Sequence, residues 1–354
     1  MPSPIQSILR KATRSDSETL NILTFPTHER YEENLAKTGH NFYSWTEPGV
    51  TKQGWNSDYA KVPDNYILLN PQRGIKQLPD YIDIDLVLIQ NRFGQFQIGS
   101  QIARQIPCPT VALEHTTTPE GEYAVEKGGV INYDASTTYK IQHRAKAADF
   151  NVFISEYNRK MWGWEEDEAE VIHHGVNTET FNCRVPAGDR KPIAFSVVND
   201  WINRDWCCGY NFWVEAVQYP GGLPVRVVGD TEGLSESTKS TEELVSHFND
   251  CAVFVNTSTA SPIPTSVLEA MSCGCAVVST DNCMIPSIVK HGYNGYCTND
   301  PKEMREYILR LFENPELATS LGNNARKTVL KNFSVSAFVK KWNNLFYRVI
   351  GRTI

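Results

Sequence analysis

The residues best suited to chemistry follow one apolar strand. The strand at 252–255 leads into a loop rich in serine, threonine and proline, and a helix is expected to begin near Thr265 and Ser266. The free N–H groups and positive dipole of a helix N-terminus suit a diphosphate. Glu269, one turn later, can accept hydrogen bonds from ribose hydroxyls. The residues that we assign to this binding site are Pro264, Thr265, Ser266, Val267 and Glu269.

The same residues have a purely structural interpretation. Ser266 and Glu269 have the spacing of a capping box, in which the two side chains satisfy the N–H groups at the start of a helix. Residue types and spacing alone leave both interpretations open.

Three further candidates also follow strands. Arg204 comes after the strand at 193–198, and Asp230 ends the strand at 225–228. A cation such as Arg204 would stabilise negative charge growing on a leaving phosphate, although a surface ion pair with Asp205 is the alternative. His115 directly follows the strand at 110–114, beside Glu114, which either binds a substrate or is solvated.

Two strand ends nearer the N-terminus supply candidates for contacting a second substrate. His28 and Arg30 follow the strand at 21–25, and Asn91 and Phe93 follow the strand at 85–90. Ordinary surface residues are the alternative for all four. Because ligands bind at the carboxyl ends of the strands in open α/β sheets, these positions are expected to line a site.

The elements that must position these residues alternate along the chain. Near-continuous apolar runs are typical of parallel strands covered on both faces, and helical stretches separate them, which predicts doubly wound sheets. The remaining predicted strands lie at 41–45, 151–154, 170–172 and 276–279. The predicted helices lie at 28–38, 96–105, 135–148, 211–218, 241–249, 267–272, 301–313, 315–332 and 335–349.

A break rich in proline and charge at 182–192 is interpreted as a linker. The predicted division is an N-terminal Rossmann-like domain at 1–185, a second at 186–334, and a crossing-back C-terminal helix at 335–354. The length of 354 residues suits two domains.

Composition excludes several classes of function. The net charge of −7 argues against a protein that binds nucleic acid through its overall field. No apolar run is long enough to span a membrane. The nine cysteines show no paired metal-ligand spacing, so no metal is expected and a cytoplasmic setting fits. Residues 5–14 are interpreted either as a short amphipathic helix or as a frayed extension.

Several of these segments together resemble family 4 retaining glycosyltransferases, also described as glycosyl transferases group 1. The run from Pro264 to Thr280 is similar to the family's LEAMACGxPVVAT pattern, and 285–296 to its EIVxxGxNG element. Val228-Gly-Asp230 is similar to its VGDG strand end. Ile172-His-His-Gly-Val-Asn177 is similar to its interdomain element, with His174 replacing an asparagine. The resemblance extends over about 150–345.

This resemblance implies a GT-B fold, in which two Rossmann-like domains face a central cleft and the C-terminal helix packs back toward the first. It implies transfer of a sugar from a nucleotide diphosphate, with a UDP-sugar expected, retention of configuration, and no cofactor or metal. Glu269 matches the ribose-binding glutamate of the family, and His115 its active-site histidine. The acceptor is expected to be a glycan, a lipid-linked sugar, a protein or a modified DNA base.

Two departures leave a second function open. The first acidic residue of the family motif should fall at Ser261, and Asn203 and Cys208 replace the usual arginine and lysine, which leaves Arg204 as the remaining cation. The alternative is therefore a catalytically degenerate GT-B protein that binds a nucleotide or glycan without turnover. Asp83-Ile-Asp85 is not taken as a metal motif because it enters its strand at the amino end.

Overall fold

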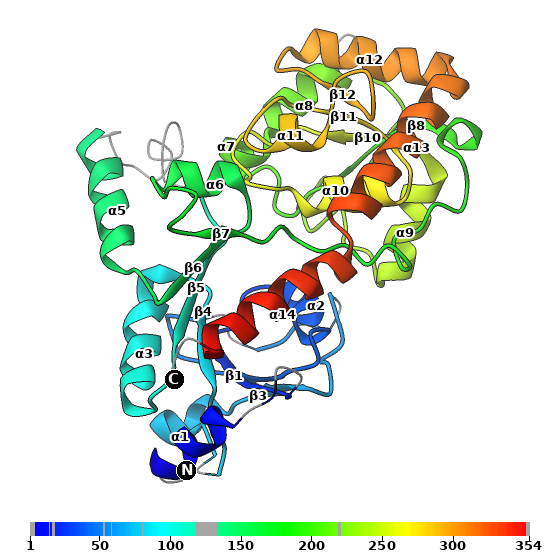
Figure 1. Cartoon of the computed structure of the whole chain (residues 1–354). Coiled ribbons are helices and arrows are strands. Elements are labelled where there is room, and N and C mark those ends of the chain that lie inside the picture. The colour runs from blue at the N-terminus through cyan, green and yellow to red at the C-terminus, as the bar shows by residue number, and fades with distance from the viewer. Residues whose placement is uncertain are drawn as a thin grey trace. The chain divides into compact units, whose positions relative to one another are not determined.

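The computed structural model describes residues 4–13, 15, 18–51, 54–57, 59–79, 81–117, 133–218 and 221–351 (Figure 1). These residues form two compact units. The first unit contains the described residues up to 115, then 137–175 and those from 336 onward; the second contains 116–117, 133–136 and 176–335. The predicted boundaries at 185/186 and 334/335 remain predictions of the domain limits.

The first unit is built on a seven-stranded parallel sheet with the order β3-β2-β1-β4-β5-β6-β7. Its strands are β1 (Asn21–Thr24), β2 (Asn41–Ser44), β3 (Tyr66–Leu68), β4 (Leu86–Ile89), β5 (Thr110–Glu114), β6 (Phe150–Phe153) and β7 (Glu170–Val171). Its helices are α1 (Pro4–Ala12), α2 (Glu29–Ala36), the 3-10 helix η1 (Pro71–Lys76), α3 (Arg92–Gln105), α5 (Tyr133–Ala145), α6 (Glu156–Met161) and α14 (Val335–Gly351). The first residues of α5 and α14 belong to the second unit.

Alternate residues along each strand of this sheet face opposite helical layers. One face packs against Leu35 of α2 and against α14, and the other packs against Ala103 of α3. Helix α14 packs against the first sheet through Phe338, Trp342 and Phe346, which recur at helical spacing and are almost fully buried. The predicted return of the C-terminal helix to the first half of the chain is confirmed.

The second unit is built on a five-stranded parallel sheet with the order β12-β11-β10-β8-β9. Its strands are β8 (Lys191–Val197), β9 (Val225–Val228), β10 (Cys251–Asn256), β11 (Ala276–Ser279) and β12 (Tyr296–Cys297). Its helices are η2 (Ala187–Asp189), α7 (Asp205–Cys208), α8 (Tyr210–Val217), α9 (Thr241–Asp250), α10 (Thr265–Ser272), α11 (Ile285–Ile288), α12 (Pro301–Glu313) and α13 (Pro315–Asn332). The two doubly wound sheets expected from the sequence are thus confirmed.

The segment interpreted as a linker is packed into the second unit. Arg190 is buried and donates hydrogen bonds to backbone oxygens of Val185, Phe248 and Cys273. A Cβ atom on Gly188 would lie 2.2 Å from the carbonyl oxygen of Pro315, so only glycine fits this approach. The proline and charge that suggest a linker therefore belong to a folded turn.

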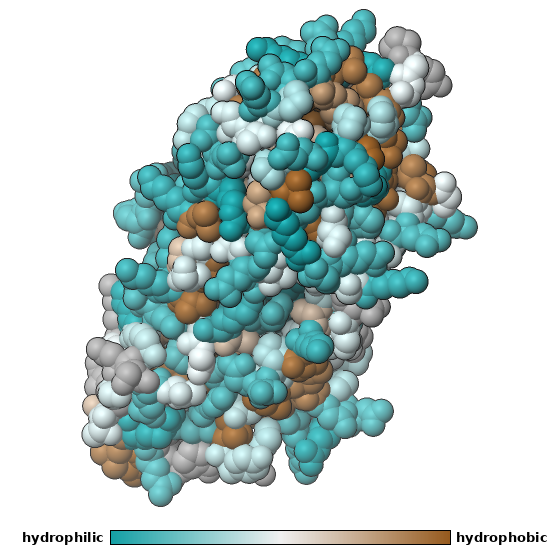
Figure 2. Space-filling model, turned by 90° about the vertical axis from the view of Figure 1, so that its right-hand side faces the viewer, coloured by the Kyte–Doolittle hydropathy of each residue, from teal (hydrophilic) through white to brown (hydrophobic). Residues whose placement is uncertain are grey.

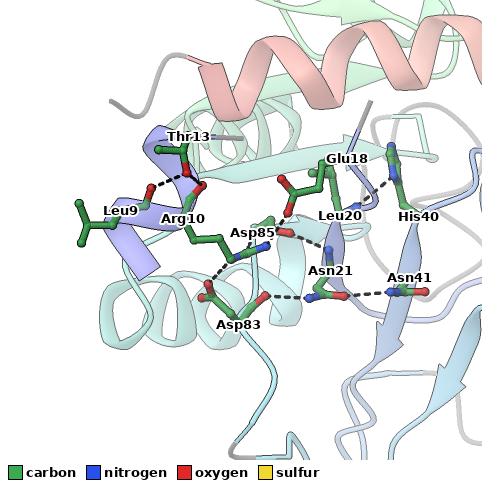
Figure 3. Close-up of polar contacts among 10 residues, drawn as sticks. All are labelled: Leu9, Arg10, Thr13, Glu18, Leu20, Asn21, His40, Asn41, Asp83 and Asp85. Atoms are coloured by element: carbon green, nitrogen blue, oxygen red, sulfur yellow. Dashed lines mark hydrogen bonds and ion pairs between the residues drawn. The ribbon is translucent and has the colours of Figure 1, made fainter. Parts of the chain in front are cut away.

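Arg10 links helix α1 to residues that precede and begin strands of the first sheet (Figure 3). The Arg10 guanidinium donates to Asp83 at 2.8 Å and also pairs with Asp85 and Glu18. Asp85 in turn accepts the backbone N–H of Asn21. The helical interpretation of this segment is therefore correct over its described residues, and Asp83 and Asp85 serve as its anchor.

The face of the molecule in Figure 2 is mostly hydrophilic. On the face shown in Figure 2, apolar side chains form small groups separated by hydrophilic ones, as is usual for the surface of a folded protein. In the described parts of the chain, no helix is both long and apolar enough to cross a membrane.

Candidate functional site

The strand order of the first unit marks where a ligand should bind. Strand order reverses between β1 and β4, which are neighbours in the sheet, and crevices at such reversals bind ligands in open α/β proteins. Thr27 follows β1 and Gln90 follows β4. Their side chains meet, because Thr27 Oγ1 lies 3.2 Å from Gln90 Oε1.

A buried carboxyl group lies beneath this reversal. Oε1 of Glu32, from α2, accepts the backbone N–H and the hydroxyl of Thr27, both at 3.0 Å, and Nε2 of Gln90 at 2.8 Å. Its Oε2 accepts the hydroxyl of Tyr66 at 3.0 Å. Burial outweighs these bonds and raises the pKa of Glu32 to about 7.

His115 joins this network from the end of β5. Its Nε2 lies 3.1 Å from Oε1 of Gln90. Its Nδ1 forms no hydrogen bond with any residue that the structure describes. Burial of the ring lowers the pKa of His115 to about 4, so the imidazole is neutral at physiological pH.

Two further rings border His115. The Tyr31 ring stands edge-on to His115 at 4.8 Å and to His174 at 5.1 Å, and the two histidine rings are 6.1 Å apart. Burial also lowers the pKa of His174, to about 3. The histidine that replaces the family's asparagine therefore adds a second neutral imidazole beside His115.

The other candidates of the first unit are placed less centrally. His28 is the N-cap of α2, where its Nδ1 accepts the backbone N–H of Arg30 at 3.3 Å, and its charge acts on both His115 and His174. Asn91 is the N-cap of α3 and accepts the N–H of Phe93 at 2.8 Å. Phe93 packs against Trp162 in a separate aromatic cluster.

Glu114, adjacent to His115 in the chain, belongs to the interior. Its Oε2 lies 3.0 Å from Nε2 of His143 and 3.7 Å from the guanidinium of the fully buried Arg92. Burial lowers the pKa of Arg92 to about 10. The solvated interpretation from the sequence is therefore wrong for Glu114, because its carboxyl group is buried among these partners.

In the second unit the strand order reverses between β8 and β10. A Cβ atom on Gly229 would lie 1.9 Å from the carbonyl oxygen of Val198, so the loops after β8 and β9 touch through backbone alone. Asp230 accepts the N–H of Asp200 at 2.8 Å, which joins these loops a second time. Asp230 is thus a loop anchor at the expected edge of the sheet.

Arg204 lies in the loop after β8, immediately before α7. Its guanidinium donates to the carbonyl oxygen of Asn199 at 3.3 Å and forms no ion pair with the residues that the structure describes. Asp205 instead accepts the backbone and side-chain N–H groups of Asn211, at 2.8 and 2.6 Å. The surface ion pair considered from the sequence does not form; Arg204 is exposed, and Cys207, Cys208 and Asp200 act on its charge.

Helix α10 begins two residues before the capping-box interpretation requires, because that interpretation makes Ser266 the N-cap. Its N-cap is Pro264, with no side-chain cap, so Ser266 is already inside the helix. The capping box is therefore wrong. The N–H of Val267 bonds to the carbonyl of Pro264, whereas those of Thr265 and Ser266 have no acceptor among the described residues. Glu269 is buried within the same helix.

Backbone carbonyls of α7 hold the loop that leads to α10. The carbonyl of Cys207 accepts the N–H groups of Thr259 and Ala260, and that of Cys208 accepts the Thr257 hydroxyl at 2.9 Å. The loops after β8 and β10, which flank the strand reversal, are thereby joined. Arg204 and the open end of α10 belong to these two joined loops.

The second unit offers a cation and free N–H groups, which suit an anionic diphosphate. The first unit offers a neutral imidazole with one nitrogen that has no hydrogen-bond partner among the described residues, which suits a hydroxyl. The sequence reasoning missed Glu32 and Gln90. A signal existed for Gln90, since it directly follows an apolar strand, but none existed for Glu32 inside a helix.

Comparison with known proteins identifies relatives of this arrangement. The model of the family "Glycosyl transferases group 1" matches residues 236–328. An uncharacterized glycosyltransferase of Methanocaldococcus jannaschii is 35% identical over 87% of this chain and 84% of its own. Another glycosyltransferase of that organism matches over only 25% of this chain and 23% of its own length.

Two further comparisons extend the likeness. The N,N'-diacetylbacillosaminyl-diphospho-undecaprenol alpha-1,3-N-acetylgalactosaminyltransferase of Campylobacter jejuni is 30% identical over 65% of this chain and 69% of its own. The Anabaena protein HepE, solved in complex with UDP, superposes with a TM-score of 0.68 at 14% identity, covering 94% of this chain and all of HepE. The latter likeness concerns the fold.

Proposed function

Because the chain belongs to the glycosyl transferases group 1, we propose that it moves a sugar from a nucleoside diphosphate to a hydroxyl acceptor with retention of configuration. The chain is a glycosyltransferase of the GT-B fold. The donor class, the stereochemistry and independence from metal are the proposal. We expect a UDP-sugar, and the complex of HepE with UDP supports this choice.

One observation carries the proposal. Arg204, which forms no ion pair with the described residues, and the N–H groups of Thr265 and Ser266 are positive groups on the two loops that flank the strand reversal of the second unit. A diphosphate at this reversal would gain charge-assisted hydrogen bonds from both. Such fixed positive groups stabilise the negative charge on a departing diphosphate, the task for which other transferases use a metal ion.

The proposed reaction is a displacement on one face of the sugar. The bond between the anomeric carbon and the diphosphate oxygen breaks, and the acceptor oxygen bonds to that carbon from the same side. The acceptor proton passes to the departing β-phosphate. No carboxylate nucleophile is required, which agrees with Ser261 in the position of the family's first glutamate.

The acceptor side is assigned to the first unit. We propose that Nδ1 of His115 accepts a hydrogen bond from a sugar or acceptor hydroxyl, because the imidazole is neutral at physiological pH and Nδ1 has no hydrogen-bond partner among the described residues. Among the acceptor classes considered, a lipid-linked sugar or another glycan is favoured by the name of the Campylobacter relative, which specifies a diphospho-undecaprenol acceptor.

Nucleotide titration tests the proposal. The intact protein would be titrated with UDP, GDP and ADP by calorimetry, and the matching sugar nucleotides tested for release of free sugar. We expect UDP to bind, Glu269→Ala to weaken binding about tenfold, as for loss of one charge-assisted hydrogen bond, and slow sugar release. A folded protein that binds no nucleotide would refute the donor site. Binding without turnover, even with glycan and lipid-linked acceptors, would instead favour the degenerate alternative.

A further inference from the structure

We propose that Gln90 and Glu32 are positioning residues that hold His115 as the Nε2–H tautomer and so leave the Nδ1 lone pair open to a substrate hydroxyl. The tautomer follows from hydrogen bonds within the first unit. Only its use toward a substrate rests on the proposed function.

The donors and acceptors in this network can be assigned from one group that can only donate, the backbone N–H of Thr27. The backbone N–H of Thr27 points at Glu32 Oε1 at 3.0 Å, and a backbone N–H only donates. Oε1 is therefore an acceptor whether Glu32 is ionised or protonated. When Glu32 is protonated, the proton belongs on Oε2, where the rotatable hydroxyl of Tyr66 lies at 3.0 Å and can turn to accept it.

This acceptor orients the amide of Gln90. Nε2 of Gln90 lies 2.8 Å from Glu32 Oε1 and 2.9 Å from Oγ1 of Thr24. The reverse orientation would place the amide oxygen against an oxygen that must accept, which loses a buried hydrogen bond. The backbone of Gln90 is also held, since its N–H donates to Gln95 at 3.1 Å. The amide oxygen of Gln90 consequently faces His115.

The amide oxygen then determines the histidine tautomer. An amide oxygen only accepts, so Nε2 of His115, 3.1 Å away, must carry the proton. In a neutral imidazole the other nitrogen is then a bare acceptor. Tyr31, edge-on to the ring at 4.8 Å, packs against His115 and opposes a turn of the ring that would exchange the two nitrogens.

The arrangement is expected to persist as Glu32 titrates. The groups that bond to Glu32 are the hydroxyls of Thr27 and Tyr66, the amide of Gln90 and a backbone N–H, and none is a cation. The titratable neighbours that sense its charge are Tyr31 and Tyr66, and Glu29 also acts on Tyr66. Since Oε1 accepts in both states, the tautomer of His115 should be the same at pH 6 and pH 8.

Nitrogen NMR of the histidine rings tests this directly. With ¹⁵N-histidine in the full chain, and His115 assigned through His115→Gln, we expect wild type to show Nε2–H alone at both pH values. Glu32→Gln should keep that tautomer, because the backbone N–H of Thr27 orients the new amide oxygen into the place of Oε1. Gln90→Lys should reverse it to Nδ1–H, because an ammonium group can only donate to Nε2.

Gln90→Met provides a second test that does not introduce a charge. It should leave His115 as a mixture of tautomers and lower the rate of sugar release about tenfold, as for one lost hydrogen bond, with UDP affinity unchanged. A wild-type ring that is Nδ1–H or mixed, or variants at Gln90 that leave the tautomer unaltered, would overturn the positioning role. These readings stand whether or not the protein transfers sugar; a changed tautomer with an unchanged rate would overturn only the use of Nδ1.

Discussion

The Nε2 atom of His115 and the Oε1 atom of Gln90 lie 3.1 Å apart, which connects the ends of two neighbouring strands, β5 and β4. Through Gln90 the contact continues to Glu32 on α2. The imidazole of the first unit is therefore part of a hydrogen-bonded chain rather than an isolated side chain.

Arg204→Gln should lower the rate of sugar release about 10²- to 10³-fold, the usual cost of removing a group that stabilises transition-state charge. Affinity for the UDP-sugar should fall less, since the full charge on its diphosphate develops only as the bond to the sugar breaks. Steady-state kinetics and calorimetry measure the two effects. Arg184→Gln is the matched control, because Arg184 is exposed and pairs only at the surface with Glu242. Equal losses in rate and affinity would argue against this role.

Ser261→Glu should increase turnover of the sugar donor about tenfold if position 261 faces the transferred sugar, because a carboxylate can add one charge-assisted hydrogen bond. UDP affinity should be unchanged, since the nucleotide lacks the sugar. Ser261→Gln, of equal size without charge, is the control, and kinetics with several sugar nucleotides is the measurement. A fall in turnover in both variants would mean that this position tolerates no large side chain.

The pH dependence of stability should reveal the buried carboxyl group. Burial raises the pKa of Glu32 from 4.5 to about 7, so the folded protein retains a proton that the unfolded chain loses. This contribution is fully present below pH 4.5 and is lost as the pH rises through 7. Relative to Glu32→Gln, the wild-type free energy of unfolding should fall by about 3 kcal/mol from pH 4.5 to 8. Urea unfolding at both pH values measures it; parallel profiles would contradict it.

His174→Asn should have the opposite dependence. Burial lowers the pKa of His174 from 6.5 to about 3, so below pH 6.5 the unfolded chain takes up a proton that the folded protein refuses. The wild type therefore loses stability as the pH falls from 6.5 toward 3. The free energy of unfolding of the asparagine variant, relative to that of the wild type, should therefore rise by about 1–3 kcal/mol as the pH falls from 7 to 4. Thermal unfolding across this range is the check, and a constant difference would rule out the assignment.

Gly229→Ala should destabilise the second unit and weaken UDP binding together. A Cβ atom would lie 1.9 Å from the carbonyl oxygen of Val198, so the loops after β8 and β9 must separate. We expect a loss of about 2–4 kcal/mol, as for other severe backbone clashes. Gly222→Ala is the control, because its Cβ would meet no atom within 4 Å. Urea unfolding and UDP titration compare the two, and equal stabilities would refute the clash.

Much of the fold could be predicted from the sequence because its determinants are local. Each predicted strand is a short apolar run, and the pattern of α14 is visible in the spacing of Phe338, Trp342 and Phe346. The short strands β3 and β12 were not predicted, since Tyr66–Leu68 and Tyr296–Cys297 carry too few apolar residues to stand out. The segment after β10 was identified from its motif and its position at a strand end.

The sequence by itself determined the elements, the doubly wound class and the family, because periodicity and motifs are properties of neighbouring residues. Tertiary structure alone decided the partners of Gln90, Glu32 and His115, which are far apart in the chain and meet only through the strand order β1-β4-β5. It also decided that Asp205 binds Asn211, while the guanidinium of Arg204 donates to Asn199. A side chain's partner depends on which strands become neighbours and on the direction in which each residue points. The spacing of residues along the chain determines neither.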